Sequence, residues 1–180
     1  YDAVINDVKI GKGAGSISSN ILIGKGIALA ANTTGYSNTV IGNNAAAVNT
    51  TGNRNIAIGD SALKANATGY KNVAVGGSTF GFAPYADNVT GLGYLAGAYY
   101  VNGSLLNGSI TNITCLGSES RVSGNNQVQL GNATTTTYAY GAVQDRSDIR
   151  DKADIENTPL GLDFICKINP VQYRWNYRDD

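Results

Sequence analysis

Residues 38–71 of the chain read NTVIGNNAAAVNTTGNR followed by NIAIGDSALKANATGYK, two segments of equal length that share their glycines, asparagines and aliphatic positions. Related segments flank them, beginning at Asn20 and Asn72. The glycines that follow the aliphatic motif lie at positions 24, 42, 59 and 76, so their spacing along the chain is nearly constant. A fixed period of this length predicts a repeat architecture, in which each repeat stacks on the next.

Each repeat contains one clear strand signal and two turn signals. The residues one and three before the glycine are mostly apolar, as in Ile56 and Ile58, which predicts a strand of four or five residues. A Thr-Gly pair, as at residues 51 and 52, marks a second turn, because glycine accepts positive φ and asparagine bonds its own backbone in tight turns. We therefore expect two short strands and two turns per coil of a β-solenoid, and eight coils would form a rod roughly 40 Å long. Weaker matches to the glycine spacing extend the repeat at Gly11, Gly93, Gly117 and Gly131.

A coil of this size buries few side chains, so we expect neighbouring copies to supply the missing contacts, most simply as a parallel three-fold bundle. The isoleucines, valines and leucines beside the glycines are expected to point into a dry interior that the chains share. The alanines at positions 45, 46, 47 and 62 suit a close approach between chains. The alternative is a flexible polar linker, but a linker has no reason to keep aliphatic residues at fixed distances from a glycine.

The composition changes near Gln144. Residues 1–143 hold 22 of the 23 glycines and 12 of the 26 charged residues, whereas residues 144–180 hold one glycine and 14 charges. This shift predicts two domains, 1–143 and 144–180. The first is expected to be all-β, a homotrimeric parallel β-solenoid or β-roll shaft, and the second a small α+β segment.

The overall composition disfavours several functions. The net charge is zero, which disfavours nucleic acid as a partner, and no apolar run is long enough to predict membrane insertion. The chain has no histidine and only two cysteines, so we expect no metal site and no cofactor. Carboxylates are sparse and scattered before residue 144, which disfavours the paired acids of a glycosidase.

The stretch from residue 78 to residue 101 interrupts the repeat and concentrates aromatic residues. Two interpretations stay open: the rings pack the trimer, which we favour, or they contact a receptor, since function often lies on irregular insertions. The aromatic residues concerned are Phe80, Phe82, Tyr85, Tyr94, Tyr99 and Tyr100.

The pattern N-x-A-I-G-x-x-A-L, seen at residues 55–63, with T-G-x-x-N at residues 68–72, resembles the head repeats of trimeric autotransporter adhesins. It is equally similar to the repeat-rich shafts of bacteriophage tail fibres. Both resemblances imply an intertwined, trimeric, left-handed parallel β-roll.

Residues 147–175, SDIRDKADIENTPLGLDFICKINPVQYRW, resemble the opening of the self-cleaving intramolecular chaperone domain of endosialidase tailspikes and other phage fibres. The resemblance implies a catalytic dyad in which Ser147 is the nucleophile and Lys152 its base, with Arg146-Ser147 as the cleaved bond. A serine hydroxyl needs a base to become a nucleophile, and a lysine serves only when neutral. The alternative is that both are ordinary polar residues of a charged connector.

Together these observations favour a segment of a phage tail fibre or tailspike, a trimeric rod for host attachment with a chaperone segment that assists assembly. The expected partners are further copies of the chain, other virion tail proteins and a host-surface glycan or protein receptor, and the expected location is the virion. Any catalysis would be a single self-cleavage without turnover. The rival interpretation is a trimeric autotransporter head on a bacterial surface, and a polysaccharide-degrading spike is a third class.

Overall fold

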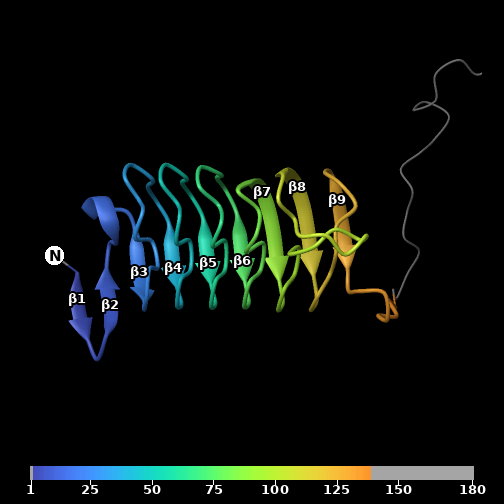
Figure 1. Ribbon diagram of the computed structural model, residues 1–180, viewed down its shortest axis with the longest axis horizontal. Helices are drawn as coiled ribbons and strands as arrows, with labels where there is room; N and C mark the ends of the chain where they lie inside the picture. Colours follow the sequence, from blue (N-terminus) through green and yellow to red (C-terminus); the bar gives the residue numbers. More distant parts are fainter. Residues whose placement is uncertain (1, 139–180) are drawn as a thin grey trace, which may run out of the picture. The chain divides into compact units, whose positions relative to one another are not determined.

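The structure, a computed structural model, describes residues 2–138, which form a single nine-stranded sheet with its strands in chain order (Figure 1). The described residues contain no α-helix and one short 3-10 turn, Ala14–Ser16. The expected all-β architecture is therefore confirmed for this part of the chain, and the expected parallel sheet is found to be mixed but mostly parallel. The strands are β1 (Ala3–Ile5), β2 (Val8–Gly11), β3 (Ile21–Gly24), β4 (Thr39–Ile41), β5 (Ile56–Ile58), β6 (Val73–Val75), β7 (Tyr85–Leu92), β8 (Ser109–Leu116) and β9 (Gln127–Leu130).

Strands β3 to β9 are parallel and in register, one strand per coil. The glycine continuation at positions 93, 117 and 131 is confirmed, because each of these glycines directly follows one of the last three strands. The weak match at Gly11 is wrong. That glycine ends β2, which forms an antiparallel hairpin with β1 and pairs antiparallel with β3, so the first two strands cover the edge of the stack and add no coil.

The return half of each coil is not a second strand, which corrects the expectation of two strands per coil. In this half Ala46, Leu63 and Phe80 have φ values of 46°, 49° and 47°, in the left-handed region that an extended strand excludes. Backbone hydrogen bonds still join successive coils here, as from Leu63 N to Thr79 O at 3.1 Å. The return path is thus a stack of turns, held between coils as a strand would be.

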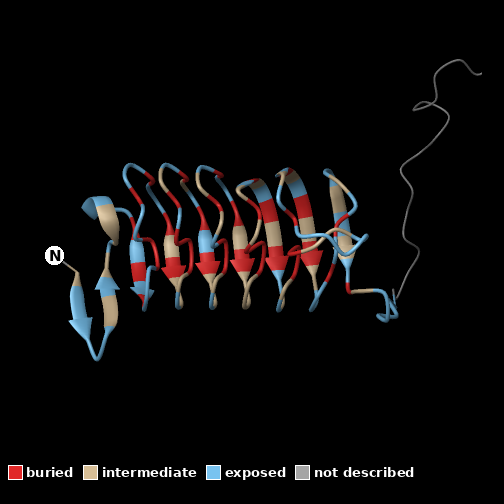
Figure 2. Ribbon diagram, viewed as in Figure 1, coloured by how far each residue is buried: buried red, intermediate tan, exposed pale blue. Residues whose placement is uncertain are grey.

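The interior of the coils is lined by many alanines together with larger side chains such as Leu29, Leu63 and Phe80. In the strands, the residue two before each glycine points inward, and Val40, Ala57 and Ala74 are completely buried. The alanines expected between chains lie inside this chain instead: Ala45 and Ala62 have no exposed surface, and Ala46 and Ala47 expose 3%. Buried residues follow the middle of the stack, whereas the β1–β2 hairpin is exposed or half-buried (Figure 2).

Buried asparagines explain the recurrent Asn and Thr-Gly positions. Asn55 donates from Nδ2 to Gly69 O at 2.9 Å, and its Oδ1 accepts from Asn72 N at 3.2 Å, so one side chain closes its own coil and bonds the next. Asn38 does the same one coil earlier. Buried polar groups need such partners, and the ladder supplies them for Asn20, Asn38, Asn55 and Asn72, whereas Oδ1 of the buried Asn49 has none.

The stretch from residue 78 to residue 98 does not interrupt the coil, which corrects that expectation. Phe80 occupies the interior position that Leu63 fills one coil earlier, and it is completely buried. A Cβ added to Gly97 would lie 2.0 Å from the Phe80 ring, so the next coil makes room by having glycine there. The departure from the regular period comes afterwards, within the longer stretch that separates Gly93 from Gly117.

Candidate functional site

The side chains beside the repeat glycines form a continuous surface on the outer face of the sheet. Paired residues in a sheet share a face, so the strand register aligns them in two rows across the coils. None of the fifteen side chains is charged. We call this surface the aliphatic face; its rows are Ile10, Ile23, Ile41, Ile58, Val75, Leu92, Leu116, Leu130 and Ile21, Thr39, Ile56, Val73, Thr90, Thr114, Val128.

These side chains lie outside the coil rather than within it. Ile23 is 40% exposed, Ile56 38% and Leu92 45%, whereas the intervening Ala57 has no exposed surface. One chain therefore completes its own interior with the intervening residues and leaves the larger aliphatic groups at its surface. A contiguous apolar surface of this kind marks an interaction site.

The sequence carried a signal for this division. The intervening residue is small in successive coils, as at Ala57, Ala74 and Gly91, while its neighbours stay large. Side chains alternate between the two faces of a strand, so where the inward residue is this small its large β-branched neighbours lie on the other face. Residue size, and not apolarity alone, distinguishes the inside from the outside.

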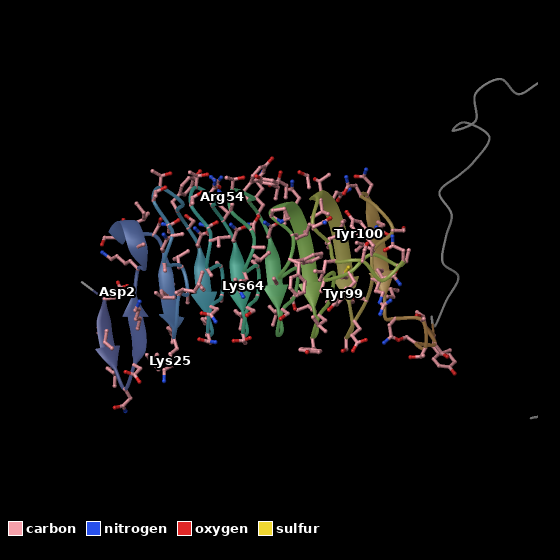
Figure 3. All side chains as sticks on the ribbon, in the orientation of Figure 1. Asp2, Lys25, Arg54, Lys64, Tyr99 and Tyr100 are labelled. Atoms are coloured by element: carbon pink, nitrogen blue, oxygen red, sulfur yellow. The ribbon has the colours of Figure 1, made fainter. Side chains whose placement is uncertain are left out.

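The six aromatic residues singled out from the sequence do not form one cluster. Phe80 lies in the core and exposes no surface for a receptor, while Tyr85 and Tyr94 are 50% and 58% exposed. The structure brings together Phe82 and Tyr99, both half-buried, with ring centroids 6.0 Å apart. Tyr100 is half-buried and packs against the core, and it lies beside Tyr99 at the β7–β8 end of the coils (Figure 3).

Sequence reasoning missed Arg121, whose guanidinium lies over the Tyr99 ring at 5.8 Å from its centroid. The pairing of residues 99–100 with the backbone at Val122 holds the two side chains on adjacent coils. No residue motif marks this contact. The only trace of it in the sequence is the longer spacing between Gly93 and Gly117, which lets the chain add a loop at this coil.

The expected dyad, Ser147 and Lys152, and the expected cleavage site at Arg146 lie outside the described residues. The same holds for the α+β segment expected after residue 144. Their assignment depends on the comparison of the sequence with known families.

Residues 147–180 match the peptidase family described as "Chaperone of endosialidase". The match begins at Ser147, the residue that the resemblance makes the nucleophile. It covers 34 of the 180 residues and so assigns this segment but not the repeats. No curated protein and no solved structure matches the chain.

Few groups in residues 2–138 suit other chemistry. In this part of the chain no three histidine, cysteine, aspartate or glutamate side chains gather to hold a metal ion, and no helix is long and apolar enough to cross a membrane. Cys115 is a buried free thiol in β8, and burial raises its pKa to about 11 despite an opposing hydrogen bond with Ser120. A protonated, inaccessible thiol is a poor nucleophile.

Proposed function

We propose that residues 1–143 form one chain of a homotrimeric phage tail-fibre shaft, and that residues 144–180 begin the chaperone domain that aligns the three chains. The aliphatic face carries this proposal. It runs across β2 to β9 without a charge, and its side chains are exposed or half-buried in the single chain.

A second copy of the chain is the occupant that fits this face best. The side chains repeat at the spacing of adjacent strands, about 4.8 Å, along the whole stack. A surface with the same repeat matches it coil for coil, and closed rotational symmetry then gives every copy the same contacts. Chaperones of the family matched by residues 147–180 act in trimeric proteins and are typical of phage tail fibres, which favours this function over an autotransporter head.

A charge in the middle of the face tests the trimer. Ile58→Glu would place a carboxylate in the apolar contact, where its desolvation disfavours association. Lys64→Glu is the matched control, because Lys64 is exposed on the return half of the same coil and receives the same carboxylate. Light scattering after gel filtration should give a trimer for the wild type and Lys64→Glu, and a monomer for Ile58→Glu. A trimer that Ile58→Glu leaves intact would exclude the aliphatic face as the interface.

The chaperone segment is proposed to cleave the chain once before Ser147, with Lys152 as the base. Intact-mass measurement of the full product should show a fragment that begins at Ser147. Ser147→Ala and Lys152→Ala should abolish this fragment, because one removes the nucleophile and the other its base. Lys167→Ala, a lysine change in the same segment, should leave it unchanged. Cleavage that persists in Ser147→Ala would contradict the dyad.

The trimeric rod is also proposed to attach the virion to its host. Its partners would be other virion tail proteins and a host-surface glycan or protein receptor. The regular coils supply a stiff support for this task because every coil is bonded to the next through its strand, its return turns and its asparagine. Attachment of labelled protein to host cells, competed by unlabelled protein, would test this role.

A further inference from the structure

A pocket of about 390 Å³ lies where the loop after Gly97 meets the last described coil. Its volume is within the range of small-molecule sites. The residues that matter most for its chemistry are Val101, Glu119, Arg121, Gln129 and Ala133, and all of them come from one chain.

The Arg121 side chain is oriented but leaves its donors available. Its guanidinium lies over the Tyr99 ring, an arrangement that limits the rotamers of the arginine and leaves the N–H groups at the edge of the plane free to point elsewhere. Within residues 2–138 the one ion pair joins Lys25 and Asp7, so Arg121 and Glu119 are not paired with each other. Glu119 also accepts no side-chain hydrogen bond from another described residue.

Hydrogen bonds fix the opposite wall of the pocket. Asn132 Oδ1 accepts from Thr134 N at 3.0 Å and from Thr134 Oγ1 at 2.8 Å, which holds the chain in a turn. Gln129 donates from Nε2 to Gly131 O at 3.3 Å, so its Oε1 remains an available acceptor. The pocket thus offers a guanidinium donor, a carboxylate acceptor and an amide acceptor on a supported backbone.

We propose that this pocket binds an uncharged sugar ring. The Glu119 carboxylate disfavours an anion and the Arg121 guanidinium disfavours a cation, whereas a hydroxyl both accepts from Arg121 and donates to Glu119. The side chains of Val101, 59% exposed, and Ala133 supply apolar surface for the C–H face of the ring. The preference for an uncharged sugar is inferred from these side chains alone. That the sugar belongs to a host surface rests on the proposed function.

The chain contains a close match to the Arg121 arrangement outside this pocket. Arg54 lies over the Tyr36 ring at 5.2 Å, on the turn edge of the regular coils (Figure 3). Arg54→Gln removes an exposed arginine stacked on a tyrosine, as Arg121→Gln does, but leaves the pocket intact. It therefore separates binding in the pocket from any general effect of an arginine–tyrosine pair.

The test is titration of the full chain with the methyl glycosides of glucose, galactose and mannose, followed by saturation-transfer NMR, with glucuronic acid as the anionic comparison. We expect at least one neutral glycoside to bind, and Arg121→Gln and Glu119→Gln each to weaken it about tenfold or more, the effect of one lost hydrogen bond to a charged group. Arg54→Gln should change nothing.

Three results would overturn the proposal: no neutral glycoside binds the wild type, both pocket variants bind as well as the wild type, or glucuronic acid binds more tightly than every neutral glycoside. The mass of each variant, measured in parallel, reports on the trimer separately. Adhesion of the wild type but not of Arg121→Gln to host cells would then identify the bound sugar as a surface component. If the free glycosides bind but the wild type and Arg121→Gln adhere equally to host cells, the pocket binds sugar without contributing to attachment.

Discussion

The coils built from residues 20–76 and those built from residues 77–131 share one sheet and one register but differ in their return paths. In the first group the paired positions follow one another at an even spacing, as from Thr39 to Ile56 and on to Val73. The last two steps are uneven, a long one from Thr90 to Thr114 and a short one from Thr114 to Val128, yet the strands stay in line. Strand register therefore depends on the short motif before each glycine, and length varies in the loops, where the entropic cost of added residues grows slowly.

The interiors of the two groups also differ. The regular coils carry buried asparagines at positions 20, 38, 55 and 72, whereas Val89 and then Ile113 occupy the equivalent places further along the sheet. Phe80, with Gly91 and Gly97 beside it, occupies the inner position that Leu29, Ala46 and Leu63 hold in the regular coils. The first group combines an apolar core with a repeated polar ladder, whereas the second packs its apolar core around one large ring.

The largest effect should come from Phe80→Ala, which removes the ring on which the irregular coils pack. The substitution should lower the free energy of unfolding by about 3–5 kcal/mol, as for a fully buried aromatic side chain that leaves a cavity. Denaturant unfolding of the full chain would measure it. Phe82→Ala, on a half-buried ring close in sequence, should cost clearly less. Equal losses for the two variants would show that Phe80 is not the centre of this packing.

Asn55→Ala tests the polar ladder of the regular coils. It removes a buried side chain and leaves Asn72 N without its partner, while Gly69 O keeps the hydrogen bond from Asn66 Nδ2, and the loss should cost about 2–3 kcal/mol. Asn53→Ala is the control, because Asn53 is half-buried and its side chain accepts a hydrogen bond from the exposed Arg54 side chain, while its backbone bond from Lys71 N is unaffected by the change. Hydrogen exchange should locate the loss at the coils of β5 and β6. If Asn55→Ala were as stable as the wild type, the asparagine ladder would make no contribution to the stability of the coils.

In the irregular coils, Cys115 lies at the inward strand position that Ala57 and Ala74 occupy in the regular coils, and its titration distinguishes the two groups. Its pKa is raised from 9.0 to about 11 by burial, so the folded state keeps this proton longer than the unfolded state. The stability that follows is fully present below pH 9 and is lost as the pH rises through 11. At about 1.4 kcal/mol per pKa unit, the loss amounts to about 2–3 kcal/mol.

The measurement is the difference between the wild type and Cys115→Ala in their unfolding free energies from pH 8 to pH 11.5. The two proteins differ only at this residue, so the difference isolates the thiol. The wild type should lose its advantage only above pH 9. Parallel curves over the whole range would contradict a raised pKa in the folded state.

The sequence was sufficient to predict the strand before each repeat glycine, the parallel stacking of these strands and the second turn of each coil, because the motif at Ile56–Ile58 and the pair at residues 51 and 52 repeat with a fixed period. It did not predict the return path, since the left-handed conformation of Leu63 is imposed by packing and by bonds to the next coil. It also placed Ala62 between chains, because alanine fits a narrow interior and a tight interface equally well.

The candidate sites were less accessible to sequence reasoning. The sequence indicated that the side chains of the aliphatic face lack packing partners within one chain. The face of the strand on which Ile56 lies could be assigned only by comparing its size with that of Ala57. The contact of Arg121 with Tyr99 joins distant positions of the chain across an irregular loop, and no period predicts it. The residues around Ser147 were assigned by their ordered motif, which the family comparison matches from that residue onward.

The most direct test of the central claim is sedimentation equilibrium of the full chain as the Ser147→Ala variant, so that self-cleavage does not alter the mass. If the aliphatic face joins three copies, the folded species should have a mass of about 56 kDa, three times the 18.7 kDa of one chain, at every concentration in the micromolar range. A folded species of 18.7 kDa, with the aliphatic face in water, would contradict the account.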